Sequence, residues 1–354
     1  MKRFWLLLAS EFRLARMAIP IHLVAFLQPV VMYLLMTAVL VNPTFDVNLR
    51  RPDSLAGEAL LAAMVQVGSP IGAPYINPIL VDGSKPSGSR QVISVEDYGG
   101  QPTAVQRYDL IDSNMVKNYR NRLTAAIKMV WDDDLGSRAV TIVERPWLAR
   151  DRSYDIYFGL AMLPLSAFMT AVLVGAITTA GDFETGTILE YRLTPFPAGM
   201  ILGARLVRLT LTALIADGLM LAAIWGVAGA APRSLALTAA ILAPVAIVAG
   251  CLGVLAGLIM QSTIPAFIIG LVSTFAGWIL GGAFGLPAGF GGGYEFVSRF
   301  MPHTYAVEVL FGEFYGIQVA ALMSSVLVLV GYATVMIVVT LFVYRSRVSR
   351  QVQR

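Results

Sequence analysis

The stretch "IYFGLAMLPLSAFMTAVLVGAITTAGDFETGTILEYRLTPFP" (residues 156–197) combines two kinds of sequence. Its first part, 156–181, contains no Asp, Glu, Lys or Arg, and about 20 apolar residues are enough to cross the hydrocarbon core of a bilayer. Its second part, "GDFETGTILEYRLTPFP" (181–197), is short and polar, begins with acidic residues and ends in prolines. The stretch is therefore typical of a membrane-spanning helix followed by a short helix in water.

Similar apolar windows occur on both sides of this stretch. Five further windows of this kind are Ile19 to Val41, Leu209 to Ala230, Leu235 to Met260, Ile264 to Leu286 and Val319 to Tyr344. Together with Ile156 to Gly181 they make six. The chain is 57% hydrophobic and 14% charged, whereas a soluble domain carries about 25% charged residues. Alternating ten-residue segments typical of a membrane β-barrel are absent, so we expect an all-α polytopic membrane protein with six transmembrane helices.

The basic residues indicate how the helices are oriented, because cytoplasmic loops carry an excess of Lys and Arg. With the N-terminus inside, the short outer loops contain only Arg233 and Arg299. The inner side contains Lys2, Arg3, Arg13, Arg16, Arg192, Arg205, Arg208, Arg345, Arg347, Arg350 and Arg354. We therefore expect a multi-pass protein of the cell (plasma or inner) membrane with both termini cytoplasmic, including a basic tail at 345–354.

The N-terminal residues 1–18 predict an amphipathic helix lying on the inner face of the membrane. Phe4, Leu8, Phe12 and Ala15 share one face, while Arg13 and Arg16 are expected to point to water. The apolar run is too short for a signal peptide. Residues 19–41 form the first transmembrane helix in this interpretation.

Residues 42–155 are predicted to form an external α+β domain between the first and second transmembrane helices. Within it, 54–67 predicts a helix capped by Ser54, and 77–82 and 90–96 predict strands around a turn-rich loop. Residues 103–131 predict a mainly helical segment, and 138–147 another strand. Cys251, the only cysteine, lies in the fourth apolar window, so no disulfide within the chain holds this domain together.

The remaining segment, 156–344, is expected to contain five transmembrane helices and two short extra-membrane features. Residues 287–316 are rich in glycine and aromatic residues, which favours re-entrant or interfacial helices at the outer side. Residues 182–193 predict a short helix with acids at its start and proline after its end. Such a helix has little apolar surface of its own, and its natural use is to bind in a groove of another protein.

The segment 181–197 resembles the region after the second span in ABC transporter permeases of the second exporter type (the ABC type-2 membrane domain family). Glu184, Gly186, Thr187, Leu189, Thr194 and Pro195 carry this resemblance. A second match, in the outer segment, is carried by Gly281, Gly282, Pro287, Pro302, Thr304, Tyr305 and Glu308. The order of elements along the whole chain is similar to that of the family as well.

The resemblance implies a permease subunit that exports an amphipathic, lipid-like or drug molecule. Two such chains, identical or related, would assemble with two copies of a separate ATPase. The sequence contains no GxxxxGK[ST] phosphate loop, so we expect this chain to be a transport subunit and no enzyme. It would bind no cofactor itself, with ATP and Mg held by the ATPase. Membrane lipids are the other expected partner, and nucleic acid is not expected.

The residues expected to couple the permease to the ATPase lie in the 182–193 helix. Glu184 and Glu190 would offer charged contacts, and Ile188 and Leu189 an apolar patch. The complete predicted set is Asp182, Glu184, Thr185, Gly186, Thr187, Ile188, Leu189, Glu190 and Arg192.

The family analogy places the substrate path between two permeases, lined by the first, second and fifth spans. The polar candidates are Gln28, Tyr33, Thr170, Thr178, Ser273 and Thr274, with Asp217 added from the third span. Pro287, Pro302, Tyr305 and Glu308 are assigned to an outer gate. Glycines four residues apart (Gly253 and Gly257; Gly277, Gly281 and Gly285) permit close helix approach at a subunit seam. His22, His303 and Glu308 do not share the spacing of a metal site, so no metal is expected.

Asp217 is the only acid inside an apolar window, where a charge costs at least about 2.5 kcal/mol. Arg205 and Arg208 are about 18 and 13.5 Å away along a helix, too far for direct pairing within it. Asp217 could make a structural polar contact or contact the substrate. It is also the basis of an alternative function, an ion-gradient-driven secondary transporter. A membrane sensor without transport activity is a third possibility, but it would not need six spans or a docking helix.

Overall fold

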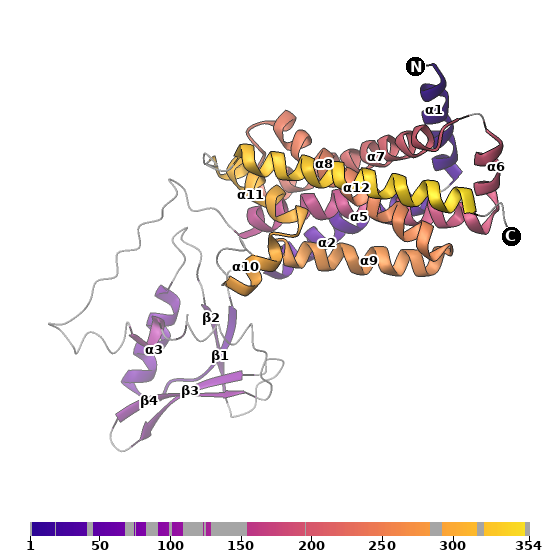
Figure 1. Cartoon of the computed structure of the whole chain (residues 1–354). Coiled ribbons are helices and arrows are strands. Elements are labelled where there is room, and N and C mark those ends of the chain that lie inside the picture. The colour runs from indigo at the N-terminus through magenta and orange to yellow at the C-terminus, as the bar shows by residue number, and fades with distance from the viewer. Residues whose placement is uncertain are drawn as a thin grey trace. The chain divides into compact units, whose positions relative to one another are not determined.

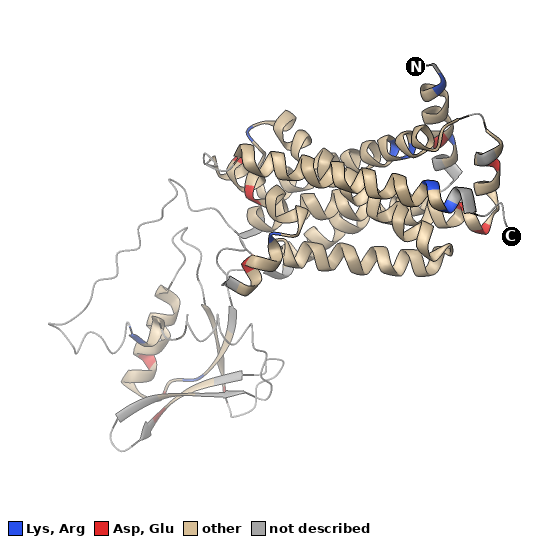
Figure 2. Ribbon diagram, in the orientation of Figure 1, with Lys and Arg blue, Asp and Glu red and all other residues tan. Residues whose placement is uncertain are grey.

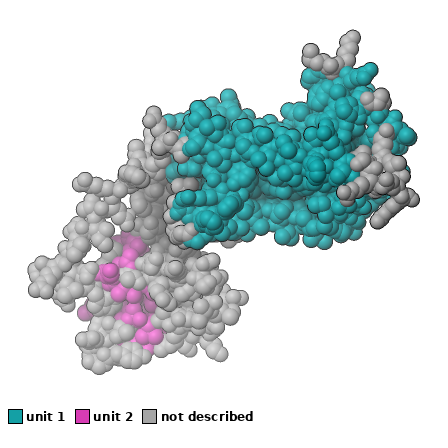
Figure 3. All heavy atoms as spheres, viewed as in Figure 1, with its two compact units in different colours: residues 1–38, 152–354 teal, residues 39–151 magenta. Residues whose placement is uncertain are grey.

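The computed structural model describes residues 2–17, 19–40, 45–67, 74, 76–82, 91–98, 101–108, 123, 125–128, 154–194, 196–283, 292–316 and 322–350. The chain divides into two compact units (Figure 3). Unit 1 comprises Met1–Ala38 and Arg152–Arg354, and unit 2 comprises Val39–Asp151.

Unit 1 is helical in the residues that the structure describes (Figure 1). Its long helices are α2 (Ile19–Leu40), α5 (Tyr154–Glu184), α7 (Ala198–Ala228), α8 (Leu235–Met260), α9 (Thr263–Leu280) and α12 (Leu322–Arg350). Its shorter helices are α1 (Lys2–Met17), α6 (Thr187–Leu193), α10 (Gly292–Ser298) and α11 (Pro302–Tyr315). The six long helices are long and apolar enough to cross a membrane, which agrees with the prediction of six transmembrane helices.

Helix α5 forms the centre of unit 1. It packs against α7, α8, α9 and α11, and 94% of its most apolar window is buried. By contrast, the windows of α2 and α12 are 22% and 17% buried. A helix that is apolar on all sides can be enclosed by others without leaving polar groups unpaired, and α5 fits this description because its sequence between Ile156 and Gly181 has no charged side chain.

Two glycines of α8 allow it to lie very close to α5. A Cβ atom on Gly253 would be 2.4 Å from the Val172 carbonyl oxygen, and one on Gly257 would be 2.6 Å from Thr179 Cβ. The sequence-based prediction placed these glycines at a seam between subunits. That prediction is wrong for this pair, because both glycines form the contact between α8 and α5 within one chain. Cys251, two residues before Gly253 on α8, is fully buried.

Helices α7 and α12 extend farther than the apolar windows suggested. Helix α7 begins at Ala198, eleven residues before the predicted span, so Arg205 and Arg208 belong to the helix instead of an inner loop. Helix α12 continues to Arg350 and therefore includes Arg345 and Arg347, which were predicted to lie in a tail. A search for uncharged windows stops at the first charge, whereas a helix continues wherever its charged residues find partners or water.

Basic side chains gather at the end of unit 1 that carries α1 and α6 (Figure 2). Arg205 and Arg208 lie near the start of α7, and Arg345 and Arg347 near the end of α12. This distribution is the one on which the predicted cytoplasmic placement of both termini rests.

Unit 2 contains a four-stranded sheet in the order β2-β1-β3-β4. The strands are β1 (Phe45–Arg50), β2 (Ile76–Val81), β3 (Gln91–Tyr98) and β4 (Gln101–Tyr108). Strand β1 is parallel to β2, from Phe45 opposite Ile76 to Arg50 opposite Val81, and also parallel to β3. Strands β3 and β4 are antiparallel, with Tyr98 opposite Gln101. Helix α3 (Leu55–Gln66) connects β1 to β2, and the Ser54 hydroxyl accepts a hydrogen bond from the Gly57 N–H at 3.2 Å.

The core of unit 2 lies between the sheet and α3. Leu49 and Ile93 from the strands and Leu60 and Met64 from α3 are fully or almost fully buried. The predicted helix with its Ser54 cap and the two predicted strands are confirmed as α3, β2 and β3, with each end within two residues of the prediction. The position of unit 2 outside the membrane stays a prediction.

Other predictions for this segment are wrong, incomplete or concern residues that the structure does not describe. Residues 103–108, predicted as the start of a helix, belong to β4, because their pairing with β3 outweighs local helical spacing. Farther along, Leu123 and residues 125–128 are helical as predicted. Strand β1, whose sequence "FDVNLR" alternates apolar and polar residues, was not predicted. The predicted strand 138–147 lies outside the described residues.

Candidate functional site

The polar loop between the first two long helices of the predicted five-helix region is organised differently from the sequence prediction. Residues 182–193 were expected to form one helix beginning with acids. Instead α5 continues to Glu184, a turn follows at Thr185 and Gly186, and α6 begins at Thr187. Gly186 has φ 77°, a left-handed conformation that glycine adopts without steric cost. Asp182 and Glu184 therefore end a long helix and do not start the short one.

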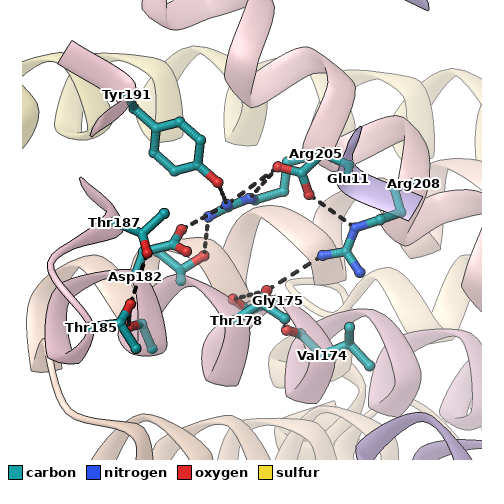
Figure 4. A network of polar contacts seen from close by, with 12 residues as sticks. Glu11, Val174, Gly175, Thr178, Asp182, Thr185, Thr187, Tyr191, Arg205 and Arg208 are labelled. Carbon is teal, nitrogen blue, oxygen red and sulfur yellow. Dashed lines mark hydrogen bonds and ion pairs between the residues drawn. The ribbon is translucent and has the colours of Figure 1, made fainter. Parts of the chain in front are cut away.

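Asp182 directs its carboxylate toward Arg205 of α7, and the two form an ion pair of 2.7 Å (Figure 4). The Arg205 side chain is only 2% exposed. Its Nη1 also donates a hydrogen bond to Thr179 Oγ1 of α5 at 3.2 Å. A charged side chain is rarely so deeply buried unless it is paired, and this pairing fixes the start of α7 against the end of α5.

Glu11 of α1 completes the charge balance of this cluster. Its Oε1 lies 3.3 Å from Arg205 Nη2, and its Oε2 lies 3.1 Å from Arg208 Nε. Arg205 and Arg208 are three residues apart on α7 and so lie on one face. Glu11 itself is 5% exposed. Two acids and two arginines are thus buried together, in what we call the charge cluster: Glu11, Asp182, Arg205 and Arg208.

Tyr191 links α6 to the charge cluster. Arg205 Nη2 donates a hydrogen bond of 3.0 Å to the Tyr191 hydroxyl, and the guanidinium carbon lies 5.6 Å from the centre of the tyrosine ring. Burial raises the pKa of Tyr191 to about 12, so its hydroxyl is neutral at physiological pH. Among the described residues, this is the polar contact that ties α6 to α7.

Glu184, which was predicted to offer a charged contact to the ATPase, makes its contacts within the chain. Its Oε1 accepts hydrogen bonds from Ser262 Oγ at 3.0 Å and from the Thr263 N–H at 2.7 Å, and its Oε2 accepts one from Thr263 Oγ1. Ser262 and Thr263 begin helix α9, whose first N–H groups have no partner within the helix. Glu184 thereby connects the end of α5 to the start of α9, so its carboxylate is already engaged within the chain.

Helix α6 has one buried side and one exposed side. Ile188 is 2% exposed and packs inside the chain, whereas Leu189 is 51% and Leu193 is 87% exposed. Glu190 is exposed too. The predicted apolar patch of Ile188 and Leu189 therefore needs correction: the residues available to a partner are Leu189, Glu190 and Leu193. We call these three residues the α6 surface.

Of the remaining residues in the predicted coupling set, Thr185 and Thr187 make contacts within the turn between α5 and α6. The Thr185 hydroxyl donates to the Gly181 carbonyl at 2.8 Å and lies 2.9 Å from the Thr187 hydroxyl. These contacts close the turn between α5 and α6. The side chain of Arg192 lies outside the described residues.

Most of the predicted substrate-path residues make contacts within or between helices of unit 1. Tyr33, Thr170 and Thr274 are fully buried, and each packs between helices: Tyr33 stacks on Phe158 at 6.5 Å, and Thr170 donates to the Ala25 carbonyl at 3.3 Å. The hydroxyls of Ser273 and Thr274 both donate to the Gly270 carbonyl of their own helix. Thr178 donates to the Val174 carbonyl and is contacted by Arg208 at 3.4 Å. Gln28 is partly exposed.

Asp217 lies inside unit 1, on the part of α7 that faces α5. It is 2% exposed, and neither carboxylate oxygen has a hydrogen-bond partner among the described residues. The Ser166 hydroxyl of α5 is near enough for a weak hydrogen bond to this carboxylate, although it does not meet the full hydrogen-bond geometry. Arg205 and Arg208 pair with Glu11 and Asp182, in agreement with the expectation that they do not pair with Asp217.

In the predicted outer segment the structure describes two helices, α10 and α11, and Pro287 lies outside the described residues. Pro302 is at the first turn of α11. The Tyr305 hydroxyl donates to the Arg299 carbonyl at 2.9 Å, and Glu308 accepts a hydrogen bond from Ser325 of α12 at 3.3 Å. The two residues thus stabilise contacts between helices, and their role in a gate stays a prediction.

His303 fills a space between α11, α9 and α5. A Cβ on Gly281 would be 2.4 Å from His303 Cβ, and the ring lies 4.5 Å from that of Phe168. Burial lowers the pKa of His303 to about 3, so the imidazole is neutral. The spacing of Gly277 and Gly281 therefore accommodates this histidine within the chain.

The sequence interpretation missed Glu11 as a site residue and treated Arg205 and Arg208 as ordinary loop cations. One signal was available: Glu11 is the only acid in the N-terminal helix and lies on the same side as Leu8 at three-residue spacing. Its burial depends on contacts with α7, more than 190 residues away in sequence, which no local pattern reveals.

The six apolar helices define a multi-pass membrane protein, an architecture that suggests a membrane transporter. No protein-family model matches the chain, and no curated protein is significantly similar to it. What the chain does is therefore inferred from its own residues and geometry.

Proposed function

We propose that the chain is the membrane subunit of an ABC-type exporter and that α6 is the helix through which a separate ATPase drives it. The observation that carries the proposal is the two-sided character of α6. Leu189 and Leu193 are exposed on a short helix outside the spans, whereas Ile188 and Tyr191 of the same helix are held by the rest of unit 1. A force applied to the α6 surface would reach α7 and α5 through Arg205.

The amino-acid pattern of residues 181–197 supports the same proposal, since it resembles the corresponding region of ABC exporter permeases of the second type. The basic residues at this end of unit 1 support a cytoplasmic position for α6 by the positive-inside rule, and ATP is available on that side. Two copies of the chain, or two related chains, would form the transport path for an amphipathic, lipid-like or drug molecule. ATP and Mg would be bound by the ATPase.

The test is purification of the tagged chain from its native cells in mild detergent, followed by identification of co-purifying subunits and measurement of Mg-dependent ATP hydrolysis. We expect an ATPase with a phosphate loop to accompany the unmodified chain. The double variant Leu189→Ser with Leu193→Ser should lose it while folding normally, because both side chains are more than half exposed and exposed substitutions usually change stability by less than about 0.5 kcal/mol.

Arg347→Gln is the matched control, since Arg347 is exposed near the end of α12 and lies outside the α6 surface. It should retain the ATPase. An unmodified chain that purifies without any ATPase would refute the proposal, and so would a double variant that retains full ATP-driven transport.

A second candidate function, secondary transport driven by an ion gradient, is favoured by one observation. Asp217 is buried in α7 without a hydrogen-bond partner among the described residues, and an ionisable group within a span is a natural proton or cation site. Transport that follows an imposed proton or sodium gradient, needs no ATP and is lost in Asp217→Asn would establish this alternative and exclude the first proposal.

A further inference from the structure

The N-terminal helix α1 is joined to unit 1 by a buried acid and not only by its apolar face. Leu8 and Glu11 are both buried, while Arg13 is exposed. The expected arrangement, with Phe4, Leu8, Phe12 and Ala15 forming a purely apolar face, is therefore incomplete. Glu11 lies at the contact between α1 and α7, beside Arg205 and Arg208 (Figure 4).

Each oxygen of the Glu11 carboxylate serves a different arginine. Oε1 faces Arg205, with 3.4 Å to Nε and 3.3 Å to Nη2, and Oε2 faces Arg208 Nε at 3.1 Å. A guanidinium is planar and presents its donors in a fixed geometry. Fixing Nε and Nη2 of Arg205 with Glu11 therefore also determines where its other contacts, with Asp182, Thr179 and Tyr191, can lie.

We propose that Glu11 is a positioning residue for α6: by orienting Arg205, it makes α1 part of the connection between α6 and the membrane helices. Arg205 is the shared member of this connection, because it contacts α1 through Glu11, α5 through Asp182 and α6 through Tyr191. The inference rests on the proposed function only for what binds to α6. The positioning itself is a property of this chain.

The charges explain why Glu11 has this effect. The cluster contains two carboxylates and two guanidinium groups, each nearly or fully buried in the chain. Without the Glu11 charge, Asp182 alone would face two buried cations. An uncompensated buried charge is strongly unfavourable, so Arg205 and Arg208 would turn toward water or compete for Asp182. In either case the hydrogen bond from Arg205 to Tyr191 is disturbed.

The experiment measures the position of α6 directly. Cysteines replace Leu193 on α6 and Arg347 on α12, both exposed, in a chain whose single native cysteine is removed by Cys251→Ala. Spin labels on the two cysteines report the distance distribution between α6 and α12 in the purified chain. We compare Glu11→Gln, Glu11→Asp and the control Arg13→Gln, which removes an exposed charge from the same helix.

We expect Glu11→Gln to shift or broaden the distance distribution, Glu11→Asp to restore it in part and Arg13→Gln to leave it unchanged. Thermal unfolding of each variant is followed by circular dichroism. A Glu11→Gln chain that unfolds at a lower temperature but keeps the original distance distribution would show that Glu11 only anchors α1, and the inference would be wrong.

A second measurement separates this inference from the proposed function. In a complex with the ATPase, Glu11→Gln should lower transport-coupled ATP hydrolysis about fivefold or more, the size of a typical coupling between sites, without releasing the ATPase. If no ATPase accompanies the unmodified chain but Glu11→Gln still displaces α6, the exporter proposal fails and the positioning role remains. If the complex forms and Glu11→Gln changes neither distance nor hydrolysis, only the positioning role is refuted.

Discussion

Arg205 shows how much depends on one side chain in a buried polar cluster. It makes contacts with Glu11, Thr179, Asp182 and Tyr191, which belong to three different helices. A lysine would keep the charge but could not reach these partners together, because its ammonium is a compact point charge. A glutamine would leave two buried carboxylates with a single arginine.

We therefore expect stability to fall in the order Arg13→Gln, Arg205→Lys, Arg205→Gln. Breaking a buried pair by removing one partner costs about 3–5 kcal/mol, so Arg205→Gln should show the largest decrease in unfolding temperature. Cys251 is the single cysteine and is fully buried, so a thiol-reactive fluorescent dye reports unfolding as this thiol becomes accessible. An Arg205→Gln chain that unfolds at the temperature of the unmodified protein would contradict the assigned role of the cluster.

Because His303 is buried with a lowered pKa, we expect the stability of the chain to depend on pH. Burial holds its pKa at about 3, compared with about 6.5 in an unfolded chain. Below pH 6.5 the unfolded chain binds a proton that the folded chain does not, so the free energy of unfolding decreases by up to about 1.4 kcal/mol per pH unit as pH falls toward 3. Above pH 6.5 His303 is neutral in both the folded and the unfolded chain, so its titration no longer changes the free energy of unfolding.

The measurement is the unfolding temperature by circular dichroism between pH 7.5 and 4.5. The unmodified chain should lose stability as pH falls, and His303→Gln should show a smaller dependence than the chain with His22→Gln. His22 is the only other histidine, which makes it the matched control. Equal pH dependence in both variants would mean that the titration of His303 is not the cause.

At the scale of elements, the contact between α5 and α8 depends on the absence of side chains. Gly253 lies so close to α5 that a Cβ would be 2.4 Å from the Val172 carbonyl oxygen. Gly253→Ala should therefore force the helices apart and lower the free energy of unfolding by about 1–3 kcal/mol, the usual cost of overpacking. Thermal unfolding by circular dichroism measures the effect.

Gly331→Ala provides the matched comparison, because a Cβ at Gly331 of α12 would meet nothing within 4 Å. Alanine favours a helix over glycine by about 1 kcal/mol, so this variant should be as stable as the unmodified chain or more so. Destabilisation of the same size in both variants would contradict the conclusion that Gly253 is needed for close packing of α8 against α5.

The elements themselves were predictable from sequence because their signals are local. The six apolar windows, α3 with its Ser54 cap and strands β2 and β3 all follow from composition or short periodic patterns. What could not be predicted depends on distant partners. Residues 103–108 become a strand because β3 lies beside them, and Asp182, in the last turn of α5, is paired with Arg205 from α7. Likewise, nothing in six similarly apolar windows indicates that α5 is the one enclosed.

At the scale of the whole molecule, sidedness in the membrane is the property on which the functional proposal depends. Unit 2 and α6 belong to different sides if the positive-inside prediction holds. On a Cys251→Ala background, Leu55→Cys in α3 and Leu193→Cys in α6 place single thiols at positions that are 86% and 87% exposed. A membrane-impermeant maleimide added to intact cells should label Leu55→Cys only, and permeabilisation should allow labelling of Leu193→Cys.

Labelling of both thiols in intact cells would place α6 outside, where no ATPase could bind it. Labelling of neither before permeabilisation would place unit 2 in the cytoplasm and overturn its assignment as an external domain. The experiment requires no knowledge of the substrate, and it can be carried out before any partner is identified.

The enclosed position of α5 also has a consequence for how the protein is made. Helix α5 is synthesised before α7, α8, α9 and α11, four helices that pack extensively against it. Until they arrive, its hydroxyl-bearing residues Ser166 and Thr179, both fully buried in the finished fold, must face lipid, the insertion machinery or a chaperone. The last of the four, α11, begins at Pro302, so most of the chain must be translated before its central helix is covered.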